Sequence, residues 1–274
     1  MSHPDFNELD TISRRIRGKV IEMSHKAETP HLGSSLSCVD ILVAAYWTAL
    51  RIDFNDPTSI TRDRFILSKG HAATALYATL AYRGFFSEDL LETFNQDGSD
   101  LGEHPSRNSV PGVEASTGSL GHGLSIGLGM ALAGRIQNSD FRVFVTISDG
   151  ECNEGTVWEA AMAIASYKLD NIAVIIDYNK WQATGRSNEV LALSPLRAKW
   201  DAFGWQTHEI DGHDMKALVS LLSKVPDGTG KPIAIVANTV KGKGVSFMED
   251  DNNWHYRVPN ADEVQRAKQE LKLV

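Results

Sequence analysis

The sequence predicts an α/β protein with a mostly parallel sheet and helices on both faces. Short apolar runs alternate along the chain with segments of helical periodicity, the pattern of strands joined by helical crossovers. Two of these runs, 141–147 and 172–177, are almost continuously apolar, which is typical of parallel strands buried on both faces. No linker, internal repeat or low-complexity stretch interrupts the pattern, so residues 1–274 are predicted to form a single domain.

Composition excludes several classes of protein. The chain has 274 residues, of which 42% are hydrophobic and 23% charged, which is ordinary for a globular domain with a large core. A net charge of −8 and the lack of any Lys/Arg run argue against nucleic-acid binding. The two cysteines, Cys38 and Cys152, have neither disulfide nor metal-site spacing, so free thiols in a reducing compartment are expected.

The sequence also bears on localisation. Residues 1–10 are polar and acidic, which argues against a secretory signal, and no segment approaches 18 uninterrupted apolar residues. A soluble, cytoplasmic protein without a membrane span is therefore expected.

The first third of the chain places two histidines in similar positions. The predicted order is a helix at 5–26, a loop at 31–37, a helix at 38–50, a strand at 64–68 and a helix rich in Ala and Leu. His31, with Ser34 nearby, and His71 each lie at the start of a helix, where an imidazole or hydroxyl can face an anion. Taken alone, each histidine would more simply be a loop or capping residue, and Ser34 or Ser37 a helix cap. The repetition favours a functional pair.

An aperiodic stretch and a glycine-rich stretch follow. Residues 95–117 lack periodicity, and a loop of this length, here containing His104, is usually functional or mobile. Glycines at 118, 121, 123, 127 and 129 then open a predicted helix, where glycine is costly. The first glycines would let backbone N–H groups approach a phosphate, and the later ones would permit close packing. No strand precedes them, so a dinucleotide fingerprint does not fit.

The last third continues the alternation. A helix is predicted at 193–203, a strand at 205–211, a helix at 214–222 and a strand at 232–238. The remainder, 241–274, is predicted as a C-terminal loop or tail that contributes to the site. Lys241 follows a strand end, where a cation could meet a phosphate, although it could equally be solvated charge.

The two central strands end in a pair of oxygen-bearing side chains. Asp149 lies in the segment 148–155, between a strand end and a helix start, and Asn179 follows thirty residues later, beyond the next strand. Open α/β sheets bind ligands at this edge, and Mg²⁺ prefers such oxygen ligands together with phosphate. A backbone carbonyl near Trp181 could supply a third oxygen. The alternative is that Asp149 and Asn179 merely cap helices and turns.

These motifs together resemble transketolase, over nearly the whole chain. The matching segments are 31–34, 68–72, 103–105, 117–121, 149–151, 168–171, 203–205, 241–244 and 254–255, and Asp149 with Asn179 resembles the thiamine diphosphate fingerprint. Three positions depart from the family's usual residues: Ser148 replaces glycine, Tyr178 replaces asparagine and His122 replaces glutamine. None removes a predicted ligand, and the roles of His122 and Cys152 stay open.

The resemblance implies roles for individual residues. Asp149, Asn179 and the Trp181 carbonyl match the ligands of Mg²⁺, which Ca²⁺ or Mn²⁺ could replace. Residues matching those that hold the cofactor are Ser34, His71, Gly118, Ser119, Leu120, Gly150, Glu154, Asn179, Lys241 and His255, with Glu154 at the subunit interface. His31, His104 and His255 match catalytic histidines that bind sugar hydroxyls and assist proton transfer.

The resemblance also implies a missing partner. The chain matches only the first of three transketolase domains, so it resembles the N-terminal subunit of a split enzyme. A C-terminal subunit would supply the catalytic glutamate, in an expected α2β2 heterotetramer. The implied reaction moves a two-carbon glycolaldehyde unit from a ketose or its phosphate to an aldose or its phosphate, in the pentose phosphate route or another sugar pathway. Alternatives are a subunit of a 2-oxo acid dehydrogenase, a deoxyxylulose-phosphate synthase-like enzyme, and a non-catalytic cofactor-binding module.

Overall fold

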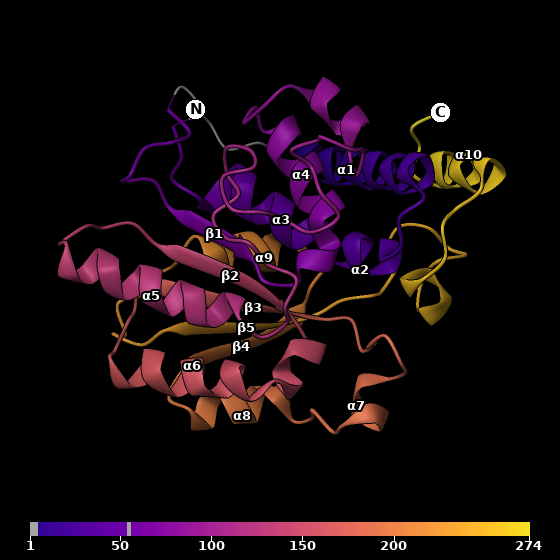
Figure 1. Ribbon diagram of the computed structural model, residues 1–274. Helices are drawn as coiled ribbons and strands as arrows, with labels where there is room; N and C mark the ends of the chain where they lie inside the picture. The colour runs from indigo at the N-terminus through magenta and orange to yellow at the C-terminus, as the bar shows by residue number, and fades with distance from the viewer. Residues whose placement is uncertain (1–4, 54–55) are drawn as a thin grey trace.

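A five-stranded sheet divides the molecule into three layers (Figure 1). The computed structural model describes residues 5–53 and 56–274. Residues 1–4, part of the stretch behind the expectation of no secretory signal, lie outside the described residues. No helix within the described ranges combines the length and the apolar character needed to cross a membrane.

All neighbouring strands in the sheet pair in parallel, which confirms the predicted fold class. The strands are β1 (Arg64–Leu67), β2 (Val143–Ser148), β3 (Ile172–Tyr178), β4 (Gln206–Asp211) and β5 (Ile233–Asn238), in the order β1-β2-β3-β5-β4. Ser148 pairs with Asp177, so the chain leaves β2 and β3 side by side. The adjacency predicted for Asp149 and Asn179 is therefore confirmed.

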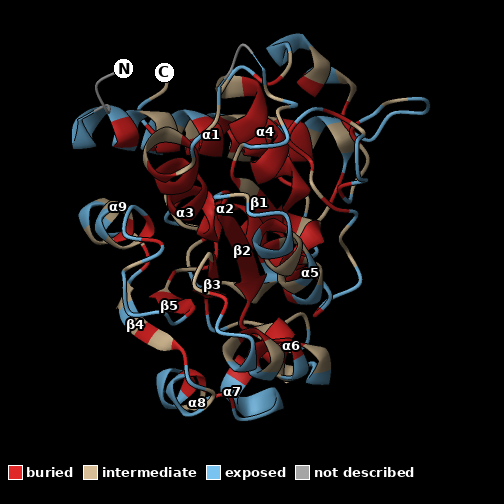
Figure 2. Ribbon diagram, turned by 90° about the vertical axis from the view of Figure 1, so that its left-hand side faces the viewer, coloured by how far each residue is buried: buried red, intermediate tan, exposed pale blue. Residues whose placement is uncertain are grey.

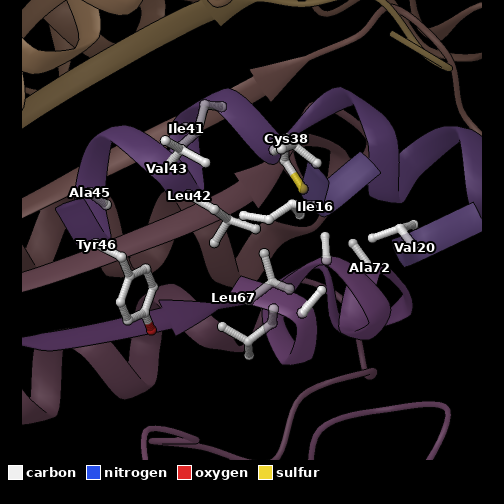
Figure 3. Close-up of a cluster of buried hydrophobic side chains, with 14 of the residues drawn as sticks. Ile16, Val20, Cys38, Ile41, Leu42, Val43, Ala45, Tyr46, Leu67 and Ala72 are labelled. Carbon is white, nitrogen blue, oxygen red and sulfur yellow. The ribbon is translucent and has the colours of Figure 1, made fainter. Parts of the chain in front are cut away.

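Helices cover both faces because side chains of the strands alternate between two cores. The helices are α1 (Phe6–Ala27), α2 (Leu32–Ser37), α3 (Val39–Ala44), α4 (Ala73–Tyr82), α5 (Gly123–Ile136), α6 (Gly155–Ser166), α7 (Ser187–Val190), α8 (Leu196–Ala202), α9 (Met215–Leu222) and α10 (Ala261–Glu270). Phe144 and Ile175 face the core beneath α1, α3, α4 and α9, whereas Val145 and Val174 face α5, α6 and α8. Figure 3 shows the first core, where side chains such as Ile16, Leu42 and Leu67 gather from α1, α3 and β1.

Burial follows this layering. Strands β1, β2, β3 and β5 and the helices between the sheet and α1 are almost wholly buried, while the edge strand β4 is partly exposed and the outer sides of α8 and α9 are exposed (Figure 2). Both cysteines are buried and free, as expected, and burial raises the pKa of Cys38 to about 12.

The structure has helices in two segments that were predicted as loop. Residues 32–37 were predicted as loop but form α2, whose Leu32 and Leu36 lie four residues apart and are buried in the core. The C-terminal segment, predicted as loop or tail, contains α10, which begins at a capping box between Asn260 and Glu263 and buries Val264. In both places a short apolar stripe and its local surroundings were enough for a helix.

Close packing accounts for Gly127 in the glycine-rich helix. A Cβ on Gly127 would lie 2.6 Å from Cγ2 of Val145, so α5 can rest on β2 only without a side chain there. Gly129 meets no atom within 4 Å, so packing within the described chain does not explain it.

A buried ion cluster lies at the edge of the sheet where the strands begin, opposite the edge where Asp149 and Asn179 follow β2 and β3. Asp63 has no exposed surface and accepts hydrogen bonds from the backbone N–H groups of Arg51 and Arg142, both at 2.8 Å. Its carboxylate also pairs with both guanidinium groups. The cluster therefore joins the starts of β1 and β2.

We predict that Asp63→Ala lowers the free energy of unfolding by about 3–5 kcal/mol, because it leaves Arg142 buried without a counter-charge. Equilibrium urea unfolding followed by circular dichroism measures this. The matched control is Asp140→Ala, which removes a carboxylate that is 83% exposed and pairs with the same Arg51; it should change stability by less than about 1 kcal/mol. Equal effects of the two substitutions would show that Asp63 does not stabilise the fold as the buried counter-charge of Arg142.

Candidate functional site

The carboxyl ends of four strands bring functional groups to one edge of the sheet. Lys69 follows β1, Asp149 follows β2, Asn179 follows β3 and Lys241 follows β5. Because the strands are parallel, all four chain segments leave the sheet on the same side, near α2 and α7 (Figure 1).

A cavity of about 420 Å³ opens at this edge. Its lining contains most of the predicted site residues, namely His31, Ser34, His71, His104, Gly118, Leu120, Gly150, Glu154, Asn179, Trp181 and His255. Ser148, Asn153, Gln182, Ala183 and Thr184 also line it. Of the predicted residues, Ser119 is exposed outside the lining, and Asp149 and Lys241 are buried next to it rather than part of it.

Four histidines from distant parts of the sequence form one cluster in this cavity. The ring centroid of His31 lies 4.9 Å from that of His255, 5.4 Å from that of His71 and 6.3 Å from that of His104. His31 adopts a left-handed backbone conformation (φ 70°), and its N–H donates to the carbonyl of His255 at 2.8 Å. The backbone therefore holds these two rings together.

Burial keeps three of these imidazoles neutral at neutral pH. Burial, together with the charge of the nearby Lys241 ammonium, lowers the pKa of His255 to about 3. Burial and the charge of Lys69 hold the pKa of His71 well below its usual value. Burial also lowers the pKa of His31, although Glu103 opposes this. A neutral imidazole both donates and accepts a hydrogen bond, as recognition of a hydroxyl requires.

Asp149 is fixed by hydrogen bonds from the segment that carries Asn179. Its Oδ2 accepts from the Lys180 N–H at 3.0 Å and from the Ser187 hydroxyl at 2.7 Å, and its Oδ1 accepts from the Gly150 N–H at 3.0 Å. Burial raises the pKa of Asp149 to about 7, against the effect of the Ser187 hydrogen bond.

A buried network that the sequence did not reveal orients Asn179. Asp177 accepts a hydrogen bond from the Ser37 hydroxyl at 2.7 Å and pairs with the ammonium of Lys69, and neither charged side chain has any exposed surface. The Asn179 amide in turn donates to Ser37 at 3.3 Å, and its Oδ1 accepts from the Trp181 N–H at 3.0 Å. The amide oxygen keeps a second lone pair for a ligand.

Glu151 holds the glycine-rich segment against the sheet. Its Oε1 accepts the Gly121 N–H at 3.0 Å and the Ser68 hydroxyl, and its Oε2 accepts the Ser148 N–H at 2.8 Å. Burial raises the pKa of Glu151. The sequence showed this glutamate only as part of a motif, with no sign of its partners.

Lys241 is a buried cation with neutral partners. Its ammonium donates to Oδ1 of Asn252 at 2.7 Å and lies 3.1 Å from Nδ1 of His255. Within the described ranges no carboxylate forms an ion pair with it. Burial and the charge of Lys69 lower its pKa to about 7. An anion bound in the cavity would compensate this charge.

An exposed clamp joins the two loops around the cavity. Arg186 forms a two-pronged ion pair with Asp250 (2.6 and 2.7 Å), and its guanidinium lies 3.8 Å from the centroid of the Trp181 ring. The Trp181 indole N–H also donates to Asp250 at 2.8 Å. The clamp thus connects the loop that carries the Trp181 carbonyl to the segment between Lys241 and His255.

The donors available to a metal here differ from those of most protein metal sites. Among the residues that the structure describes, no three His, Cys, Asp or Glu side chains are placed to hold a metal ion together. The candidate set has one carboxylate (Asp149), one amide (Asn179) and one backbone carbonyl (Trp181). Such a set suits a hard cation that takes its remaining oxygens from a phosphate and water.

We predict that Asp250→Ala loosens the loop around Trp181, because it removes both prongs of the ion pair and the indole acceptor. Hydrogen exchange of backbone amides in 180–187 should become about 3- to 10-fold faster, as for the loss of roughly 1 kcal/mol. As a control, Asp201→Ala breaks another exposed pair, with Arg197, and should leave 180–187 unchanged. Unaltered exchange in the Asp250 variant would show that the clamp does not restrain the loop.

Comparison with known proteins agrees with this geometry. Residues 10–273 match the family model described as transketolase, thiamine diphosphate binding domain. The chain is 41% identical to one subunit of the apulose-4-phosphate transketolase of Phocaeicola vulgatus, over 96% of this chain and 93% of that protein. It is 42% identical to the 6-deoxy-6-sulfo-D-fructose transketolase subunit SqwG of a Clostridium species, over 85% of each.

The fold also matches solved transketolases over part of their length. The transketolase of Campylobacter jejuni superposes with a TM-score of 0.91 and 28% identity, over 98% of this chain but 43% of that one. The chain thus spans about two fifths of the length of the solved transketolases that it matches. The family-model match and the identities to the two bacterial subunits show that this chain belongs to the transketolase family, as its N-terminal, thiamine diphosphate-binding domain.

Proposed function

We propose that this chain is the cofactor-binding subunit of a two-component transketolase, which moves a glycolaldehyde unit from a ketose or ketose phosphate to an aldose or aldose phosphate. The observation that carries the proposal is the joint lining of one cavity by the Asp149–Asn179 strand ends and the four-histidine cluster. A metal–diphosphate end alone would fit any thiamine diphosphate enzyme. The histidines add a surface suited to the hydroxyl groups of a sugar.

The residues present fit the diphosphate end of the cofactor. Lys241 is a buried cation whose hydrogen-bond partners are neutral, and two cavity residues, His31 and Gln182, carry buried nitrogens without a hydrogen-bond partner among the described residues. A buried cation and buried donors favour an anionic, acceptor-rich ligand. Cofactor contacts are proposed for Ser34, His71, Gly118, Ser119, Leu120, Gly150, Glu154, Asn179, Lys241 and His255.

A divalent cation would complete this arrangement. Asp149, Asn179 and the Trp181 carbonyl offer hard oxygens, which suit Mg²⁺, with Ca²⁺ or Mn²⁺ as substitutes. When bound, thiamine diphosphate supplies the nucleophilic carbon that cleaves a bond next to a carbonyl. The chain's own part is to anchor the diphosphate, orient it and keep the cavity polar on its histidine side.

The histidines are proposed to bind the sugar. His31, His104 and His255 lie on one side of the cavity. The neutral ring of His31 can donate to one hydroxyl and accept from another, whereas Nδ1 of His255 faces the Lys241 ammonium and leaves its Nε2–H as a donor. The same rings can move a proton between substrate oxygens.

A partner chain is required by this proposal. Glu154 and Leu120 line the cavity and are exposed, so a second polypeptide could cover this side and bring the catalytic glutamate. Relatives of similar length are named as subunits of transketolases for apulose 4-phosphate or 6-deoxy-6-sulfo-D-fructose. An α2β2 heterotetramer in the cytoplasm, acting in the pentose phosphate route or a related sugar pathway, is proposed here.

We predict that two-carbon transfer requires this chain, its partner subunit, Mg²⁺ and thiamine diphosphate together. Mixing purified chains and assaying ketose–aldose exchange tests this. Asp149→Asn should lower activity and Mg²⁺-dependent cofactor affinity at least about 100-fold, because the only carboxylate of the set loses its charge. Asp140→Asn, an exposed change far from the site, serves as the control. Transfer by this chain alone, or unchanged cofactor affinity in the Asp149 variant, would refute the proposal.

A further inference from the structure

Gln182 carries a polar group in the cavity that no described residue of the chain satisfies. Nine described residues have a buried side-chain N or O atom without a hydrogen-bond partner, and of these only His31 and Gln182 line the cavity. A buried amide nitrogen without a partner costs free energy, which a hydrogen bond to a bound ligand would recover. Neither the sequence motifs nor the resemblance assigned a role to Gln182.

The Gln182 side chain lies against the strand end that holds Asp149. A Cβ built on Gly150 would lie 3.4 Å from Cγ and 3.7 Å from Cδ of Gln182. Gly150 directly follows Asp149, and Gln182 lies three residues beyond Asn179. The amide therefore borders the place between the two strand ends where the proposed function puts the metal and the diphosphate.

The loop around Gln182 is held in place, so the backbone that carries the amide is already ordered. The Gln182 N–H donates to the Gly185 carbonyl at 2.9 Å, and the Ser187 N–H donates to the Lys180 carbonyl at 3.1 Å. The clamp between Arg186 and Asp250 fixes the same loop from outside. A ligand that binds this amide therefore does not have to order the loop backbone, which lowers the entropic cost of binding.

We propose that the Gln182 side-chain amide donates a hydrogen bond to a diphosphate oxygen of the bound cofactor, which makes it a further binding residue of this chain. The inference rests on the proposed function. A diphosphate offers only acceptors, which suits an NH₂ group, and a neutral amide adds no charge beside Asp149.

The test measures both stability and ligand affinity, because the proposal expects the removal of the amide to affect them differently. Gln182→Met keeps the length of the side chain but removes the unpaired donor. The melting temperature of the free chain should therefore stay the same or rise by about 1–4 °C, whereas affinity for Mg²⁺-bound inorganic diphosphate should fall roughly 10-fold. Gln182→Glu, which places a charge there and removes the donor, should weaken binding by at least as much. Trp181 fluorescence can report the binding, and differential scanning calorimetry the stability.

Thr207→Val is the matched control. Thr207 on β4 also has a buried, unpaired side-chain oxygen but lies outside the cavity lining, so its removal should not alter diphosphate binding.

If wild-type chain fails to bind Mg²⁺-diphosphate and thiamine diphosphate, alone and with its partner subunit, the proposed function fails. If wild type binds and Gln182→Met binds equally well, this inference alone is overturned. Weaker thiamine diphosphate binding with unchanged inorganic diphosphate binding would also overturn it, because the contact would then lie elsewhere on the cofactor.

Discussion

The buried ion pair between Lys69 and Asp177 is the contact on which the rest of the site depends. It joins the ends of β1 and β3, and the Lys69 ammonium also donates to the Ser34 carbonyl at 2.8 Å, which ties in α2. Burial alone would lower the pKa of Lys69, but the charge and hydrogen bond of Asp177, together with the nearby Cys38 and Asp149, outweigh it and the pKa is raised. Such a pair is stable only while both partners and their extra hydrogen bonds are present. Through Ser37 it also sets the direction of the Asn179 amide.

The site around this pair is preorganised but not self-sufficient. Lys241 is buried among neutral partners, and Gln182 buries an amide nitrogen that has no partner among the described residues. Both features cost stability in the free chain, and the apolar cores on the two faces of the sheet offset that cost. The same features favour an acceptor-rich anion, so they account both for the lost stability and for the proposed ligand. The histidine cluster, in which burial keeps His31, His71 and His255 neutral, makes the other half of the cavity suited to hydroxyl groups.

How much the sequence could predict depended on whether a feature was local. The sequence predicted all five strands, four of them from apolar runs and β4 from the alternation of elements, and chain order placed Asp149 and Asn179 at neighbouring strand ends. The resemblance gathered His31, His71, His104 and His255, and the structure brings them together. Helices α2 and α10 were missed because their apolar stripes are short. The partners of Asp177, Glu151 and Asp250 were also missed, since each reaches residues at least 30 positions away and leaves no periodic signal.

A crystal structure of this chain with its partner subunit, Mn²⁺ and thiamine diphosphate would test the central claim most directly. The account predicts one anomalous scattering peak at coordination distance from the Asp149 carboxylate, the Asn179 amide oxygen and the Trp181 carbonyl, with diphosphate oxygens filling further positions. A peak elsewhere in the complex, or a cofactor whose diphosphate lies away from these three residues, would contradict it.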